Sequence, residues 1–270
     1  GVLGLVSRLK GAECAMVLAG FLWFTPAAAH DFWIEPDRFR FEPGTPIAVR
    51  LFVGAPWRGD PVPRIEDWYT RFEAVSGSRA YPAEGLMGDE PAGTITDLPA
   101  GPSTIVYLST PELQEFTPEK FHVYAREEGL EWTIEERRRR GEFDAPTREH
   151  YIRYAKALIV VGKGSVPPPT ALGLELEIVP LDNPFQPSSS PHRFRVLLQG
   201  QPAEDVLVSA IHRDRPQESA QARTDAAGDV QLAISETGPW LIKAVVTERA
   251  VDAGIVDWFT RWATLTFSRK

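Results

Sequence analysis

His30 is the residue whose type and position most directly suggest chemistry. It follows a short basic stretch, an uncharged apolar run from Cys14 to Phe24, and the small residues Ala27-Ala28-Ala29. This is the layout of a secretory signal peptide, and the apolar run is too short to span a bilayer. We therefore predict that residues 1–29 are a signal peptide, and that cleavage after Ala29 makes His30 the first residue of the exported protein.

An N-terminal histidine is a good metal ligand because its α-amine and imidazole Nδ1 can close one chelate ring. Nickel, cobalt, copper and zinc all accept such nitrogen donors. His122 and His150 are expected to be further ligands because they belong to the same half of the chain, and Glu149 offers an oxygen beside His150. The alternative interpretation is that His30 merely follows a cleavage site and has no ligand role.

Composition and charge exclude several classes of function. The chain has 270 residues and a net charge of −8, which argues against a nucleic-acid partner. The only cysteine, Cys14, falls within the predicted signal peptide, so the exported part has no thiol for a disulfide, a cysteine zinc site or an iron–sulfur cluster. No stretch after the signal approaches the ~20 apolar residues of a membrane span, so none is expected in the mature chain.

The chain is predicted to be mainly β, with two β-sandwich domains. Residues 162–169 read Gly-Lys-Gly-Ser-Val-Pro-Pro-Pro, which is typical of a linker. It would separate an N-terminal sandwich, residues 30–161, from a C-terminal immunoglobulin-like domain, residues 170–270, with modest contact between them. The short β-branched and aromatic runs expected as strands are 46–53, 71–76, 103–109, 156–161, 174–179, 192–198, 205–211, 229–234, 239–247 and 261–267.

Residues 118–154 break the β pattern and are predicted to be a helical insertion in the first domain. Thr117 can cap the first helix, with Pro118 at its first position. Phe121 and Trp132 should dock the insertion onto the first sheet. The run 137–140 is four arginines, but it follows several glutamates on an acidic chain, so we interpret it as a solvated helix face rather than a phosphate site.

Several segments resemble one bacterial family along nearly the whole exported chain. Ala29-His30-Asp31-Phe32-Trp33-Ile34-Glu35-Pro36 is similar to the start of a periplasmic family associated with nickel or cobalt uptake, which is still catalogued as a domain of unknown function. Further matching segments are 120–130, 154–158, 182–185, 224–228, 238–244 and 257–267. The resemblance implies a periplasmic location, a bound nickel or cobalt ion, and delivery of that ion to a membrane metal transporter.

Catalysis is not expected, because neither a Gly-x-Ser-x-Gly elbow nor a phosphate-binding loop occurs. One enzymatic option is a copper site built on the N-terminal histidine, as in copper-dependent oxidases of polysaccharides. We expect instead a binding protein for nickel or cobalt, with copper as a third metal. The alternative is a metal-free cell-envelope interaction protein built of β-sandwich modules, whose contact residues would be Trp57, Trp68 and Trp258.

Overall fold

A computed structural model describes residues 30–186, 192–251 and 254–270. The predicted signal peptide, residues 1–29, lies outside the described residues. Strands dominate the fold, which confirms the prediction of a mainly β protein with packed sheets. No helix among the described residues has the length and apolar composition that crossing a membrane requires.

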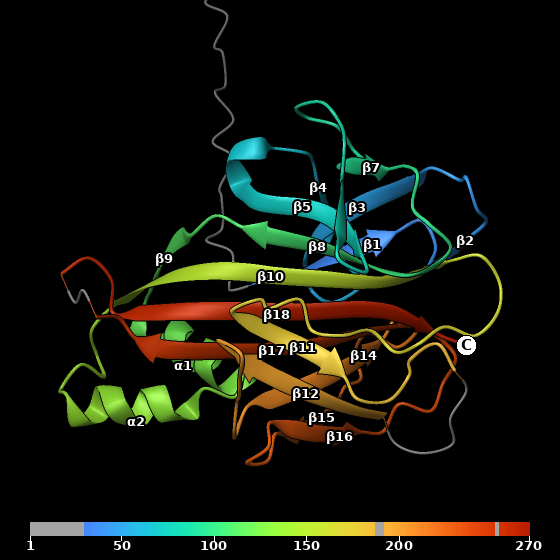
Figure 1. The fold of residues 1–270 in the computed structure, drawn as a ribbon. Coiled ribbons are helices and arrows are strands. Elements are labelled where there is room, and N and C mark those ends of the chain that lie inside the picture. Colours follow the sequence, from blue (N-terminus) through green and yellow to red (C-terminus); the bar gives the residue numbers. More distant parts are fainter. Residues whose placement is uncertain (1–29, 187–191, 252–253) are drawn as a thin grey trace, which may run out of the picture.

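The central element is a large sheet that runs through both halves of the chain (Figure 1). Its strand order along the main path is β15 (Ala220–Arg223), β14 (Leu207–His212), β17 (Gly238–Arg249), β18 (Trp258–Arg269), β10 (Thr147–Val161), β8 (Gly101–Ser109), β5 (Tyr69–Ser76) and β6 (Arg79–Pro82). Two short strands, β2 (Arg40–Phe41) and β9 (Glu112–Phe116), also pair with β10.

Two smaller sheets cover the large one. The first consists of β1 (Asp31–Pro36), β3 (Ile47–Gly54), β4 (Asp60–Val62) and β7 (Gly93–Ile95). The second consists of β11 (Leu176–Pro180), β12 (His192–Leu198), β13 (Gln201–Pro202) and β16 (Asp229–Leu232). A 3-10 turn, η1 (Glu66–Trp68), precedes β5.

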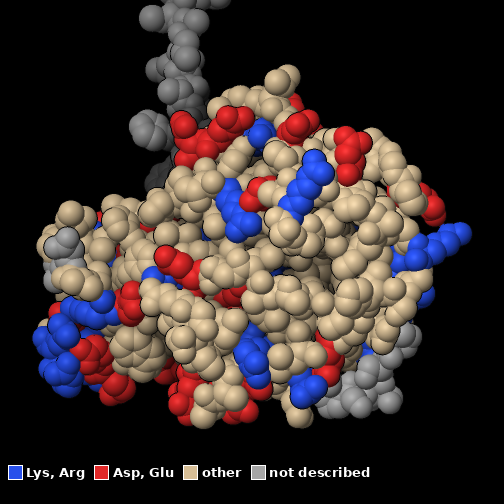
Figure 2. All heavy atoms as spheres, in the orientation of Figure 1, with Lys and Arg blue, Asp and Glu red and all other residues tan. Residues whose placement is uncertain are grey.

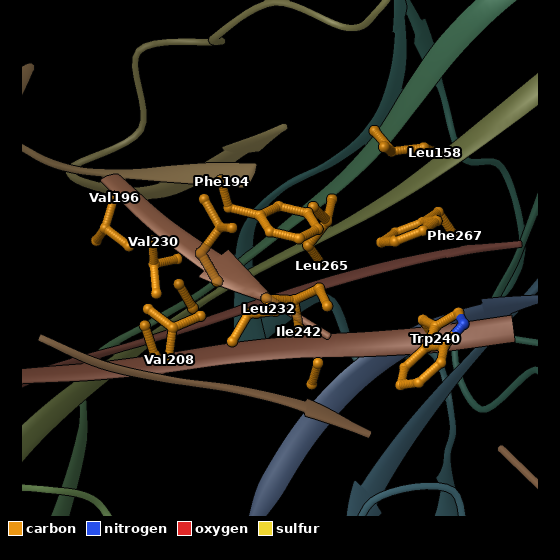
Figure 3. Close-up of a cluster of buried hydrophobic side chains, with 14 of the residues drawn as sticks. Leu158, Phe194, Val196, Val208, Val230, Leu232, Trp240, Ile242, Leu265 and Phe267 are labelled. Carbon is orange, nitrogen blue, oxygen red and sulfur yellow. The ribbon is translucent and has the colours of Figure 1, made fainter. Parts of the chain in front are cut away.

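Strand β10 separates two hydrophobic cores because its side chains alternate between its two faces. Ala155, Ala157 and Ile159 belong to the core beneath the sheet of β1 and β3. Tyr154 and Leu158 belong to the other core, which packs against the sheet of β11 and β12. Figure 3 shows part of this second core, where Phe194 and Leu265 point toward each other from different sheets.

The two halves of the chain share the large sheet, and their contact is more extensive than the sequence predicted. Strand β10 of the first half pairs in parallel with β18 of the second, from Glu149 opposite Trp258 to Ala157 opposite Thr266. Lys156 Nζ also lies 2.8 Å from Glu177 Oε2 on β11, and both side chains are buried. The expected linker, residues 162–169, connects two parts of one layered structure, and Val166 within it is buried in the second core.

The predicted helical insertion is confirmed only in part. Helices α1 (Pro118–Glu127) and α2 (Glu131–Arg139) are present, but residues 147–154 form the first half of β10. The helical prediction for that stretch was wrong because its charged residues suggested a solvated helix, whereas Glu149 and Arg153 are buried in polar contacts. The helices also pack on β17 and β18, against Val245 and Trp258, rather than only on the first half's strands.

Three of the four arginines at the end of α2 are paired with glutamates, as expected, whereas Arg137 is buried and donates to the backbone carbonyls of Glu142 and Ala145. Arg138 lies near Glu135, and Arg139 and Arg140 both bind Glu136. Figure 2 shows basic and acidic side chains mixed at the end of the molecule where Figure 1 places α2. This mixture supports a solvated face rather than a phosphate site.

Cutting the chain within residues 162–169 should not separate its halves. Because β10 and β18 are neighbours in one sheet, a protease site inserted there should yield two fragments that stay associated. Size-exclusion chromatography after cleavage would show them eluting together without denaturant. A folded C-terminal fragment that elutes alone would show that the shared sheet contributes little.

Candidate functional site

His30 lies directly before β1, on the partly exposed edge of two cavities. Its backbone carbonyl accepts a 2.8 Å hydrogen bond from Arg153 Nη1, which reaches it from β10. Strand β1 is fixed in turn by its antiparallel pairing with β3 and by Thr264 Oγ1, which donates to the carbonyl of Phe32. The backbone of His30 is therefore held through its carbonyl, while the amine and imidazole take no part in that contact.

The first cavity, called here the aromatic cavity, has a volume of about 570 Å³. Its walls include the rings of Phe32, Trp68, Tyr107 and Tyr151. Burial raises the pKa of the Tyr151 hydroxyl to about 12, so this group stays protonated and donates to Glu112. The cavity also includes His30 and the guanidinium of Arg153.

The second cavity, called here the acidic cavity, has a volume of about 580 Å³ and is also lined by His30. Four carboxylates line it, from Asp31, Glu127, Glu128 and Glu218, together with one amine, from Lys243. The excess of negative charge favours a cation over an anion here.

A buried ion cluster forms the floor of the acidic cavity. Lys243 Nζ on β17 lies 2.9 Å and 3.0 Å from the two carboxylate oxygens of Asp31, and 3.2 Å from Glu128 Oε1. Burial lowers the pKa of Lys243, but the two carboxylates outweigh it and the net direction is upward. Burial also raises the pKa of Glu128 to about 7, more than Lys243 lowers it.

The end of α1 places Glu128 against this amine. Helix α1 begins at Pro118 after the Thr117 cap, whose hydroxyl accepts from the Lys120 amide, and Glu128 is its C-cap. Gly129 follows with φ +73°, a left-handed conformation in which a Cβ would lie 2.5 Å from Leu207. Glycine is therefore required to turn the chain and leave Glu128 facing β17.

The other two predicted ligands lie in different surroundings from His30. His122 is buried in α1, where its ring stacks on Phe143 at 4.4 Å and its Nε2 has no hydrogen-bond partner. Burial and then the neighbouring Arg137 lower its pKa. His150 lies on β10, where alternation puts it on the opposite face from Tyr151 and Arg153. The helix-end position predicted for His150 is therefore wrong.

Glu149, the predicted oxygen ligand beside His150, is engaged elsewhere. Its Oε2 accepts from Thr260 Oγ1 at 2.7 Å and from the hydroxyl of Tyr124 at 3.1 Å, while Oε1 is buried without a partner. Burial raises its pKa to about 7. Within the described ranges, no three His, Cys, Asp or Glu side chains are grouped so that they could hold a metal ion.

The remaining sequence expectations concern tryptophans and the histidines of the second half. Trp258 is fully buried and Trp57 partly so, with its indole donating to the carbonyl of Ile211, whereas Trp68 is 47% exposed. Only Trp68 is thus well placed for a surface contact. His192 and His212 are both buried, and the ring of His212 contacts the carbonyl of Thr237.

Sequence reasoning missed Arg153, Lys243 and the partners that bury them. A usable signal was present: Lys243 stands inside an apolar strand run, and Asp31 stands in the run Asp-Phe-Trp-Ile. A charge inside a strand that is otherwise apolar indicates a buried partner, although the sequence does not say which one.

Comparison with known families places the chain in one of them. A family model described as "Domain of unknown function (DUF4198)" matches residues 27–248, and the chain belongs to this family. This confirms the resemblance to a family catalogued as a domain of unknown function, while its association with nickel or cobalt stays a prediction. No curated protein matches the chain.

Among solved structures, the D0-D1 domain of Intimin matches with 12% sequence identity over 88% of this chain and 97% of that chain. The TM-score of that match is 0.22, so no functional argument follows from it. The description of the fold above rests on the strands and sheets of the chain itself.

Glu149→Gln should flatten the dependence of stability on pH. Burial raises the folded-state pKa of Glu149 from its ordinary value of 4.5 to about 7, so its contribution to stability is fully present below pH 4.5 and is lost as pH rises toward 7. The fall in unfolding free energy between pH 5 and pH 8 should shrink by on the order of 2 kcal/mol in the variant. Urea unfolding at both pH values measures this. Exposed Glu115→Gln is the control, and an unchanged fall in Glu149→Gln would contradict the expected burial cost.

Lys243→Met should destabilise the protein strongly, because it leaves Asp31 and Glu128 buried together without their counter-ion. We expect a loss of about 3–5 kcal/mol at pH 8. The loss should be smaller at pH 5, because Glu128 takes up a proton readily. Thermal and urea unfolding compare this variant with Lys120→Met on the exposed side of α1. Equal losses in the two variants would contradict a role for the buried cluster.

Proposed function

We propose that the chain is exported to the periplasm, is cleaved after Ala29, and binds a divalent transition metal through the new N-terminal His30. Nickel or cobalt is the expected ion, with copper as a further metal that the same donors accept. The protein would buffer the ion or pass it to a membrane metal transporter. It acts as a binding protein and not as an enzyme.

The position of His30 is the observation that carries this proposal. Arg153 holds the residue by its carbonyl, which leaves the α-amine and the ring nitrogen available once the preceding peptide bond is cut. The same residue borders the acidic cavity, whose negative charge favours a cation. Neither feature depends on His122 or His150, which lie in other surroundings.

Glu127 is the best candidate for an oxygen ligand beside His30. It lines the acidic cavity with His30 and is exposed, and among the described residues its carboxylate has no ion-pair or hydrogen-bond partner. Asp31 and Glu128 are already bound to Lys243, so they are less available. An amine, an imidazole and a carboxylate form a mixed nitrogen and oxygen set that nickel and cobalt accept.

Extending the mature N-terminus by one alanine should weaken metal binding almost as much as His30→Ala. Either change removes the paired amine and imidazole donors, while the carbonyl contact to Arg153 is kept. Isothermal titration with nickel and with cobalt would compare both proteins with the mature chain that begins at His30. Affinity should also fall as pH falls, because protons compete for the nitrogen donors.

Two further variants test the ligand set. Glu127→Gln should weaken binding less than His30→Ala does, and His150→Ala should leave it unchanged because His150 lies on the other face of β10. Unchanged affinity in the alanine-extended protein would show that the metal is bound elsewhere. Loss of binding in His150→Ala would instead restore the ligand set that the sequence predicted.

A further inference from the structure

Arg153 is a buried cation with no carboxylate beside it. Arg153 is 8% exposed, and its Nη1 donates to the carbonyl of His30 at 2.8 Å. Its guanidinium lies over the rings of Tyr151 and Phe32, 5.2 Å and 5.6 Å from their centroids. Throughout the described ranges, no carboxylate lies within ion-pair distance of this side chain. Burying an unpaired charge is costly, and an anion bound beside the guanidinium would offset that cost.

The guanidinium lines the aromatic cavity rather than a closed core. The cavity volume of about 570 Å³ lies within the range of small-molecule sites. Apolar and aromatic side chains form most of its wall, including Phe32, Trp68 and Tyr107. A largely apolar pocket with one convergent charged group is the usual architecture of a ligand site.

Neither Glu112 nor Glu149 forms an ion pair with Arg153, because other groups bind their carboxylates. Glu112 is exposed and accepts the hydroxyl proton of Tyr151. Glu149 is buried and accepts from Thr260 and Tyr124. The cavity wall therefore carries a buried positive charge at Arg153 and an exposed negative charge at Glu112.

We propose that the aromatic cavity binds a small organic carboxylate with an apolar or aromatic body. The carboxylate would accept two hydrogen bonds from the fork of Arg153, and the body would lie against Trp68 and Tyr107. A small hydrophilic anion would satisfy Arg153 but leave the aromatic walls without a partner, so it should bind more weakly. This site is distinct from the proposed metal site, because the aromatic cavity shares only His30 with the lining of the acidic cavity.

The test uses the mature full chain, with 3-phenylpropionate as the probe and its neutral amide, 3-phenylpropionamide, as the matched control. Titration calorimetry and tryptophan fluorescence report binding. The carboxylate should bind roughly ten- to hundredfold more tightly than the amide, since hydrogen bonds between charged partners are the strong ones. Acetate, which lacks the aromatic body, should bind more weakly than 3-phenylpropionate.

Two charge variants should shift carboxylate binding in opposite directions. Arg153→Met should remove the preference for the carboxylate over the amide, whereas Glu112→Gln should strengthen carboxylate binding by removing a repulsive charge. Neither should change the weak binding of the amide. Trp68→Ala, at an exposed side chain, should weaken both ligands and remains informative if Arg153→Met fails to fold.

Equal affinity for the carboxylate and the amide in the wild-type chain would overturn the assignment of Arg153. Absence of 3-phenylpropionate binding at millimolar concentration would overturn the site itself. Weaker binding of 3-phenylpropionate to Glu112→Gln than to the wild-type chain would also contradict the proposed site. Because no metal is present in these titrations, none of these results depends on whether His30 binds nickel or cobalt.

Discussion

The parallel pairing of β10 with β18 is the constraint on which the rest of the structure depends. It joins the two halves of the chain into one sheet, and the two smaller sheets then bury the second half of β10 on both faces. The charged groups that are buried on that strand need polar partners, because burying a charge without them is costly. Lys156 binds Glu177 on one of the smaller sheets, and Arg153 holds the carbonyl before β1. The polar residues of β10 thus fix where the covering elements lie.

The candidate site follows from these contacts. Arg153 holds the backbone of His30 at the start of β1, and Lys243 on β17 binds Asp31 one residue further along. His30 consequently lines two cavities whose linings differ in charge. One contains an excess of carboxylates and favours a cation, while the other contains an arginine without a carboxylate partner. A metal and an organic anion would therefore occupy different cavities beside His30.

Much of the fold could be predicted from sequence, because short β-branched runs bounded by glycine and proline indicate strands locally. The caps of α1 at Thr117 and Pro118 were equally local signals. Residues 147–154 were misassigned because Arg148, Glu149 and Arg153 resemble a solvated helix when their distant partners are unknown. The joining of the halves could not be foreseen for the same reason: it depends on a pairing between residues more than a hundred positions apart, such as Thr147 and Asp257.

Of the residues that form the candidate site, the sequence predicted only His30. His30 was identified from the small residues before it and from the family resemblance, both of which are sequence signals. Arg153, Lys243 and Glu128 reach it from three elements that the sequence does not place together. His122 and His150 were selected because they belong to the same half of the chain, and that criterion ignores which face of an element a side chain occupies.

Native mass spectrometry of the protein recovered gently from the periplasm would test the central claim most directly. It reports the mature N-terminus and any bound metal in one measurement. We predict a chain that begins at His30 and carries one nickel or cobalt ion. A chain that begins at another residue, or one that begins at His30 but carries no metal after growth with nickel and cobalt, would contradict the proposed function.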